Sequence, residues 1–407
     1  MDNLTHSLAG LAVGELLHRS LPQEPDAGPQ STRRRMLLLT CAAANNFPDL
    51  DLLWSGRLPE PIGYLLDHRG HTHTFLFAVP QVLLLMALVW LLWPGVRRLL
   101  GASAAARTGL AAAAAIGLCM HIGFDYLNSY GVHPFYPLDA RWFYGDALFI
   151  LEPVLWVAFG APLIMMVGSR FLRVLFALLL AGVFAFTTAR GFLHWGSAAG
   201  LVAAGAALMA FQHRSAPSGR RTLLAGMAAA SGFVFLQAQL GAQGRAHITD
   251  AIKRGAPQAR VLDVAMTPFP ANPLCWNFVS VERDDSRAVY RLRRGMYSPA
   301  PGVMAVDACP SGFGMPATSG APGLSFSWTH EAPLADLRAL GRHCRGQAWL
   351  RFARMPALWP QGATDARFSP SEGRNFTTMP LEGIAEQDCP TNMPAWGVPR
   401  EDLLAMP

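Results

Sequence analysis

Long apolar runs dominate the N-terminal part of this chain and restrict the folds that it can adopt. They lie at residues 75–93, 109–124, 148–167, 171–189, 195–211 and 223–240. A helix needs about 20 predominantly apolar residues to cross the hydrocarbon core of a bilayer, and these runs, with their flanks, approach that length. Two shorter apolar helices are expected at residues 4–17 and 36–45, before and after a polar loop at residues 22–35. We therefore predict a polytopic helical bundle in a membrane.

The composition of the chain changes near residue 243. The whole chain is 52% hydrophobic and only 15% charged, and the apolar excess lies before this point. After it, charged residues, proline and glycine become frequent, as in an ordinary soluble domain. We predict a mainly α protein, with a helical membrane domain at residues 1–243 followed by a soluble β-rich domain at residues 244–407.

Local patterns give a coarse view of the C-terminal part. Apolar and polar residues alternate at 276–281 and 288–292, around a turn-like Asp284-Asp285-Ser286 segment, which predicts a pair of strands. Residues 347–352 predict a further strand, and residues 334–343 predict a helix.

Arginines indicate how the bundle is oriented. They cluster at the ends of apolar runs, which is typical of membrane anchoring and not of nucleic-acid binding, so we predict no nucleic-acid partner. If residues 67–74 face one side, alternation of the spans places most arginines on the other side: Arg33, Arg34, Arg35, Arg97, Arg98, Arg107, Arg170, Arg173, Arg214, Arg220 and Arg221. The positive-inside rule makes that side cytoplasmic, so we expect the C-terminal domain in a periplasm-like space.

Cysteine positions bear on the same question. Two cysteines lie in apolar helices and four in the C-terminal part: Cys41 and Cys119, then Cys275, Cys309, Cys344 and Cys389. Four cysteines in an extracytoplasmic domain can form two disulfides, with three possible pairings. The alternative is four free thiols in a cytoplasmic domain.

A histidine-rich stretch, Asp67-His68-Arg69-Gly70-His71-Thr72-His73-Thr74, stands directly before the apolar run at 75–93. Neutral imidazole is the commonest protein ligand for metals, and such a stretch at the mouth of an apolar helix has few structural uses. We predict that His68 and His73 are ligands, ahead of His71. Gly70 permits a tight backbone there.

Three further segments carry the same chemistry at the ends of apolar helices. They are Thr5-His6, Asn46-Phe47-Pro48-Asp49-Leu50-Asp51 and His121-Ile122-Gly123-Phe124-Asp125. His121 and Asp125 are four residues apart and share one helix face. A single histidine in a helix is as often a packed core residue as a ligand, but four such motifs together favour a metal site. The predicted ligands are His6, Asp49, Asp51, His68, His73, His121 and Asp125.

This ligand set predicts both the metal and the chemistry. Mixed imidazole and carboxylate ligands suit zinc, or manganese or iron where carboxylates dominate, and seven of them can hold one or two ions. Asn46, Asn128 and Thr72 are polar enough to orient ligands. We predict catalytic roles for three further residues: Arg69 as a contact for an anionic group such as phosphate, and Asp146 or Glu152 as a further ligand or general base.

At these residues the chain resembles the YdjM-like bacterial inner-membrane proteins, also called the LexA-binding membrane-associated group, which are regarded as metal-dependent hydrolases. The resemblance covers residues 1–160 well and the remainder loosely. It rests on Met1-Asp2-Asn3-Leu4-Thr5-His6, on the three other ligand motifs, on Asn128, Tyr130 and Gly131, and on residues 144–153. It implies a multi-pass protein of the inner membrane. The His-x-x-x-Asp element is also similar to that of zinc-dependent phospholipases C.

Together these features predict an integral membrane metal-dependent hydrolase, in which metal-activated water attacks an ester or phosphoester. Membrane lipid and a small-molecule or lipid-linked substrate are the expected partners. One alternative is a non-enzymatic metal-binding scaffold or transporter, although the later spans contain almost no internal polar side chains. Another makes the C-terminal domain the working part and the helices its anchor.

Overall fold

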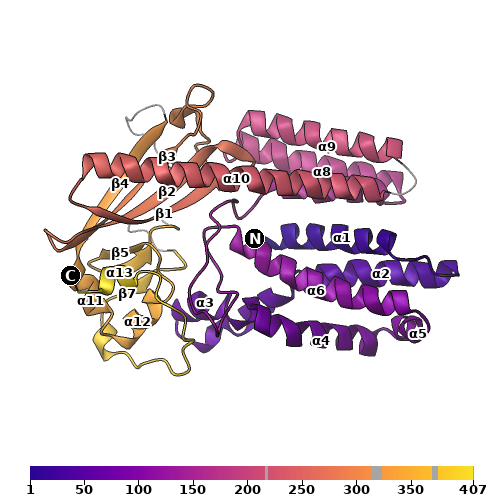
Figure 1. Ribbon diagram of the computed structural model, residues 1–407, viewed down its shortest axis with the longest axis horizontal. Coiled ribbons are helices and arrows are strands. Elements are labelled where there is room, and N and C mark those ends of the chain that lie inside the picture. Colours follow the sequence, from indigo (N-terminus) through magenta and orange to yellow (C-terminus); the bar gives the residue numbers. More distant parts are fainter. Residues whose placement is uncertain (216–218, 313–322, 369–374, 407) are drawn as a thin grey trace. The chain divides into compact units, whose positions relative to one another are not determined.

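The computed structural model describes residues 1–215, 219–312, 323–368 and 375–406, and the chain folds into two compact units (Figure 1). The first unit comprises Met1–Leu50, Thr72–Leu127 and Phe149–Leu236. The second comprises Asp51–His71, Asn128–Leu148 and Gln237–Pro407. The predicted fold class, a helical membrane bundle followed by a β-rich part, is confirmed.

The first unit is a bundle of helices. Its members are α1 (Asn3–Ser20), α2 (Ala27–Ala44), α4 (Phe75–Leu92), α5 (Pro94–Ala102), α6 (Ala104–Tyr126), α7 (Pro153–Met166), α8 (Arg170–Ala189), α9 (Trp195–Ser215) and the first part of α10 (Arg220–Gly255). Five of them, α4, α6, α8, α9 and α10, are long and apolar enough to cross a membrane. Only 6% of the apolar window of α8 is buried, so this helix presents its apolar side chains outward, as lipid contact requires.

Two sequence-based expectations for this unit were wrong. The run at 148–167 yields only the 14 residues of α7, about 21 Å of helix, which is shorter than a bilayer core. Helix α2 begins at Ala27, within the segment that we expected to be a polar loop. The helix therefore includes Arg33, Arg34 and Arg35. Arg33 is buried, and an ion pair with Glu24 at 2.7 Å compensates its charge.

Small residues let three helices of this unit approach closely. A Cβ atom at Gly10 of α1 would lie 2.6 Å from the Ala42 Cα atom of α2, and one at Gly14 would lie 2.6 Å from the Leu37 carbonyl oxygen. Gly117 of α6 plays the same part, because a Cβ atom there would lie 2.8 Å from the Cys41 carbonyl oxygen. Backbones can approach this closely only where side chains are absent. The glycines therefore determine how α1, α2 and α6 pack.

The second unit is built on an antiparallel sheet whose strands follow chain order: β1 (Arg260–Phe269), β2 (Asn272–Asp284), β3 (Val289–Tyr297) and β4 (Leu324–Pro333). A smaller sheet contains β5 (Pro356–Trp359), β6 (Gly362–Asp365) and β7 (Met379–Pro380). Among its described residues the unit also has the short helices α3 (Ile62–Asp67), α11 (Leu334–Leu340), α12 (Cys344–Leu350) and α13 (Glu401–Leu404). The strands expected at 276–281 and 288–292 are confirmed as parts of β2 and β3.

The four-stranded sheet is covered on both faces. Trp276 and Phe278 of β2 pack against Ile248 and Ile252 in the C-terminal half of α10. The alternate residues Val279 and Val281 face the opposite side, as the two-residue period of a strand requires. There they join a core shared with α3, α11, α12 and the small sheet. Residues 62–66, which lie far from the sheet in the sequence, thus help to bury the apolar side chains of its strands.

The strand expected at 347–352 is a helix, α12, which we predicted wrongly. Ala348, Trp349 and Leu350 are all buried, although alternate residues of a strand would face opposite sides. The Trp349 indole N–H also donates to the Thr377 carbonyl oxygen at 2.7 Å. Short apolar runs do not distinguish a buried helix from a strand by their period alone.

The structure selects one of the three cysteine pairings. Cys275 is joined to Cys309 and Cys344 to Cys389, while Cys41 and Cys119 are free thiols. Both disulfides lie in the second unit, and the prediction of two disulfides among these four cysteines is confirmed. They close loops with sequence separations of 34 and 45 residues, which restricts the unfolded chain.

The close packing of α1 on α2 predicts that Gly14→Ala destabilises the protein by about 1–3 kcal/mol, because the new Cβ atom collides with the backbone of α2. Thermal unfolding of the detergent-solubilised protein measures this effect. Gly182→Ala in α8 is the matched control, since nothing lies within 4 Å of a Cβ atom there. Equal stability of the two variants would contradict the packing described here.

Candidate metal centre

Four side chains from three segments of the first unit converge on one point. They are Asp49, His73, His121 and Asp125, and each offers a ligand atom within 4.8 Å of the others. Asp49 lies in the short 3-10 helix η1 (Phe47–Leu53), which follows α2. His73 stands directly before α4, whose first turn is capped by Thr74. His121 and Asp125 lie on one face of α6, as their spacing predicted.

The separations between these ligand atoms match a tetrahedral metal site. The Nε2 atoms of His73 and His121 each lie 3.5 Å from the Asp49 Oδ1 atom, and 3.3 and 3.7 Å from the Asp125 Oδ2 atom. Ligands at zinc distances of about 2.0–2.1 Å in a tetrahedron stand about 3.3 Å from one another. Two imidazole nitrogens and two carboxylate oxygens therefore fit one ion in both chemistry and spacing.

The orientation of His121 favours a metal. Its Nδ1 atom lies 2.8 Å from the Asn45 carbonyl oxygen, which can only accept, so Nδ1 carries a proton and donates. In the neutral ring, Nε2 then has a lone pair, which points at the His73 Nε2 atom 2.9 Å away. A shared cation or proton must lie between two such nitrogens. Backbone carbonyls commonly fix metal-binding histidines in this way.

Other polar side chains orient the ligands. The Thr72 hydroxyl lies 3.0 Å from the His73 Nδ1 atom, in the supporting role that the sequence predicted for it. The Asn3 amide donates to the Asp49 Oδ2 atom at 3.4 Å, and the predicted Asn46 contacts Asn3 rather than a ligand. Sequence analysis missed Asn3 and Asn45, because isolated asparagines near helix ends are usually capping residues.

His6, also a predicted ligand, lies beside the cluster rather than within its tightest group. Its ring stacks on His121 at 4.1 Å, and its Nε2 atom lies 3.5 Å from the Asp125 Oδ1 atom. Asn45 holds it from the other side, with its Oδ1 atom 3.3 Å from His6 Nδ1 and its amide donating to the His6 carbonyl oxygen. His6 is thus placed to support Asp125 or to act as a further ligand.

The carboxyl group of Asp49 is largely buried. Burial alone would raise its pKa, but the neighbouring His121 and His73 side chains hold that pKa well below its ordinary value. This environment favours the ionised carboxylate that a cation site requires.

Asp51 and His68, two further predicted ligands, belong to the second unit. The His68 Nδ1 atom lies 2.9 Å from the Asp51 Oδ1 atom, and Asp51 Oδ2 accepts from the Arg69 backbone N–H at 3.0 Å. Their coordination of a metal together with Asp49 and His73 stays a prediction.

Arg69, the predicted contact for an anion, is also buried in the second unit. Its guanidinium lies over the Tyr130 ring, 4.4 Å from the centroid, and donates to the Asn128 Oδ1 atom at 3.1 Å. Its φ angle of 59° lies in the left-handed region, which is rare for residues other than glycine. Such strained backbone is frequent at functional sites, where the surrounding structure maintains it.

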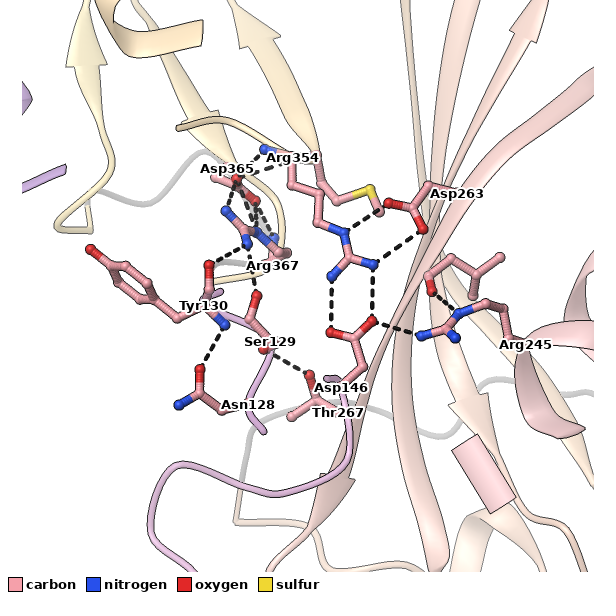
Figure 2. A network of polar contacts seen from close by, with 12 residues as sticks. Asn128, Ser129, Tyr130, Asp146, Arg245, Asp263, Thr267, Arg354, Asp365 and Arg367 are labelled. Atoms are coloured by element: carbon pink, nitrogen blue, oxygen red, sulfur yellow. Dashed lines mark hydrogen bonds and ion pairs between the residues drawn. The ribbon is translucent and has the colours of Figure 1, made fainter. Parts of the chain in front are cut away.

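Asp146 lies in a network of ion pairs within the second unit (Figure 2). Its two carboxylate oxygens accept from Arg354, each at 2.9 Å, and Arg245 donates to the Oδ2 atom at 2.8 Å. Arg354 also contacts Asp263, at 2.8 Å. Burial by itself would raise the pKa of Asp263, but the charge of Arg354 holds it well below its ordinary value. Asp146 thus joins residues 128–148 to β1 and the tail, and its catalytic role stays a prediction.

Glu152 lies at the first turn of α7 in the first unit. It is fully buried, and its Oε1 atom accepts from the Val154 backbone N–H at 3.2 Å. This contact caps the helix, which accounts for a carboxylate at this position. The predicted role of Glu152 in catalysis stays a prediction.

Comparison with known proteins agrees with the motifs. Residues 1–192 match the model of a family described as YdjM inner membrane protein, which confirms the resemblance found in the sequence. The uncharacterized protein YfhP of Bacillus subtilis (strain 168) is 22% identical over 172 residues, which cover 40% of this chain and 48% of that protein. The match thus spans about half of the relative's length. No solved structure matches the chain significantly.

The ligand geometry predicts that the purified protein contains a divalent metal and that His121→Ala or Asp125→Asn lowers its metal content at least about tenfold. Each change removes one of four converging ligands. Elemental analysis by mass spectrometry gives the stoichiometry. His213→Ala is the control, because His213 lies at the end of α9 and is exposed. Full metal content in both cluster variants would refute the site.

Proposed function

Because residues 1–192 match the YdjM inner membrane protein family and contain converging metal ligands, we propose that this protein is an integral membrane metal-dependent hydrolase. The observation that carries the proposal is the tetrahedral spacing of Asp49, His73, His121 and Asp125. Two aspartates buried together need compensating positive charge, and the Met1 amino group, which forms an ion pair with Asp125, supplies one charge for two carboxylates.

The residues of the cluster would hold the ion through two nitrogens and two oxygens, which suits zinc, or manganese or iron with additional oxygen ligands. A metal bound there would lower the pKa of a water molecule and stabilise negative charge on the substrate. Asn45 fixes the His121 ring through its carbonyl oxygen, and Asn3 restrains Asp49. His6, 3.5 Å from the Asp125 Oδ1 atom, and the Met1 amino group, which contacts the same oxygen, would hold that carboxylate in place.

The proposed substrate is an ester or phosphoester, lipid-linked where the membrane supplies it. Its anionic group would bind Arg69, whose guanidinium forms paired hydrogen bonds with phosphate or carboxylate. The described residues include five apolar helices long enough to span a bilayer, which supports access to lipid substrates. The resemblance of His121 and Asp125 to the element of zinc-dependent phospholipases C favours phosphoesters.

The proposed location is the bacterial inner membrane, with the C-terminal part in the periplasm. Arginines at the opposite ends of the spans and two disulfides in the second unit support this orientation.

A non-enzymatic metal-binding scaffold is the second candidate. The converging ligands Asp49, His73, His121 and Asp125 favour it as well, because metal binding alone requires nothing beyond them. Transport is less favoured. Passage of an ion requires polar groups across the bilayer, and α8 has no charged side chain between Arg173 and its end at Ala189.

Periplasmic placement predicts that cells contain the protein with four oxidised cysteines and two free thiols, Cys41 and Cys119. Acid quenching, denaturation and alkylation followed by mass spectrometry count the free thiols. A host that lacks its periplasmic thiol oxidase should yield six alkylated cysteines. Six alkylated cysteines in the normal host would place the tail in the reducing cytoplasm instead.

Hydrolase function predicts that the zinc- or manganese-loaded protein cleaves generic phosphodiester or ester substrates. Asp125→Ala and His73→Ala should reduce kcat/KM at least about 100-fold, because each removes a ligand of the ion that activates water. His213→Ala should retain activity.

Two results would contradict this function. Activity that persists in both ligand variants would exclude the cluster as the catalytic site. Stoichiometric metal without activity on any substrate class would favour the scaffold.

A further inference from the structure

A cavity lies in the first unit, where α1 ends and α2 begins. Its volume is about 420 Å³, within the range of about 300–1,000 Å³ that is usual for ligand pockets. Helix α1 contributes Glu15, His18 and Arg19 to the lining, and the loop after α1 and α2 itself contribute the rest: Leu21, Gln23, Gln30 and Arg34. His6, beside the metal cluster, lies about 18 Å of helix away from His18, so the cavity is separate from that cluster.

A fully buried carboxylate organises the two arginines of this cavity. The Glu15 Oε1 atom accepts from Arg19, whose Nε and Nη2 atoms lie 2.8 and 2.7 Å away. Its Oε2 atom accepts from Arg34 Nε at 2.7 Å. Both carboxylate oxygens are thus engaged by guanidinium donors, which disfavours a cation as the ligand. Two guanidiniums on one carboxylate leave an excess of positive charge in the lining.

The remaining polar atoms of the lining are mainly donors. Arg34 has two further guanidinium nitrogens, to which the described residues offer no acceptor. The Gln30 Oε1 atom already accepts from the Glu24 backbone N–H at 2.9 Å and from Arg33 at 3.2 Å, so this amide offers its NH2 group. That group lies 3.5 Å from the His18 Nε2 atom, which accepts there and leaves the ring proton on Nδ1.

The His18 Nδ1 atom is itself buried and has no hydrogen-bond partner among the described residues. Buried donors in folded proteins almost always have a partner. A cavity that combines such a donor with the unused guanidinium nitrogens of Arg34 and with excess positive charge favours an anionic ligand.

The cavity lies at the arginine-rich end of the bundle. A Cβ atom at Gly219, which directly precedes α10, would lie 3.1 Å from Arg19 Nη1 and 3.1 Å from Gln212 Nε2 near the end of α9. The adjoining ends of α9 and α10 carry further arginines: Arg214, Arg220 and Arg221. Phospholipid headgroups stand at the ends of membrane spans, and basic pockets between helices on the cytoplasmic side are typical sites for anionic headgroups.

We propose that this cavity binds the phosphate group of an anionic phospholipid, with the Arg34 guanidinium as the principal donor. The site goes beyond the proposed hydrolase and rests on the proposed orientation only for the leaflet that supplies the lipid. Arginine suits this role because its planar fork forms paired hydrogen bonds with phosphate oxygens. Free inorganic phosphate has the same chemistry, so the experiment must separate the two sources.

The test is calorimetric titration of the full-length protein in detergent with dihexanoyl phosphatidylglycerol, with zwitterionic dihexanoyl phosphatidylcholine and with inorganic phosphate. Arg34→Gln removes the guanidinium while Arg19 still compensates Glu15, and it should weaken binding of phosphatidylglycerol at least about tenfold. His18→Ala leaves both ion pairs of Glu15 in place and should weaken binding about three- to tenfold.

Arg35→Gln is the matched control. Arg35 is the next residue of α2, is exposed and does not line the cavity, so the same loss of charge there should leave binding unchanged. Metal content should also be unchanged in Arg34→Gln, because the metal cluster lies at the other end of α1 and α2. Thermal unfolding of each variant shows whether it folds.

The outcomes are distinct. Binding of phosphatidylglycerol but not of phosphatidylcholine, with losses in Arg34→Gln and His18→Ala only, supports the site. Binding of free phosphate without phosphatidylglycerol overturns the lipid as the source of the group. Equal affinities in all variants, equal binding of the two lipids, or no binding of any probe to the wild type overturns the proposal, and the arginines then serve only to compensate Glu15. Because metal content is measured on the same samples, failure of this site is distinguishable from failure of the metal centre.

Discussion

The close approach of α1, α2 and α6 is the interaction on which the metal cluster depends. Gly10 and Gly14 remove the side chains that would separate α1 from α2, and Gly117 does the same for α6, one helical turn before His121. The end of α2 can therefore place the Asn45 carbonyl oxygen on the His121 ring and the Asn45 side chain on His6. A larger residue at these glycines would act on the site through the backbone, without touching a ligand.

The second unit is not a tail that folds by itself. Leu65 and Leu66 of α3 are buried in the same core as Trp349, and the Trp396 indole donates to the Leu66 carbonyl oxygen. Asp146 adds buried ion pairs to Arg354. A fragment that begins near residue 245 would lack these partners. Its apolar core would be exposed to water, and Arg354 would lose its ion pair with Asp146. This counts against the view that the helices merely anchor an independent C-terminal domain.

The metal cluster brings buried charges of both signs together. The amino group of Met1 forms an ion pair with the Asp125 Oδ1 atom, and the His73 and His121 Nε2 atoms lie within 3.7 Å of both Asp49 and Asp125. Buried carboxylates persist only where charges or ligands compensate them. One ammonium compensates one of the two carboxylates, and a metal ion bound by the cluster would compensate the other.

The sequence by itself determined the apolar spans other than the one expected at 148–167, the strands β2 and β3, the spacing of His121 and Asp125 on one helix face, and the presence of two disulfides. These follow from local periodicity, composition and residue type. Only the tertiary structure decided the pairing of Cys344 with Cys389, the helical state of α12, the supporting roles of Asn3 and Asn45, and the membership of residues 51–71 and 128–148 in the C-terminal unit. Each of these depends on contacts between distant segments, and neither the period of a short run nor the identity of a lone polar residue specifies its partner.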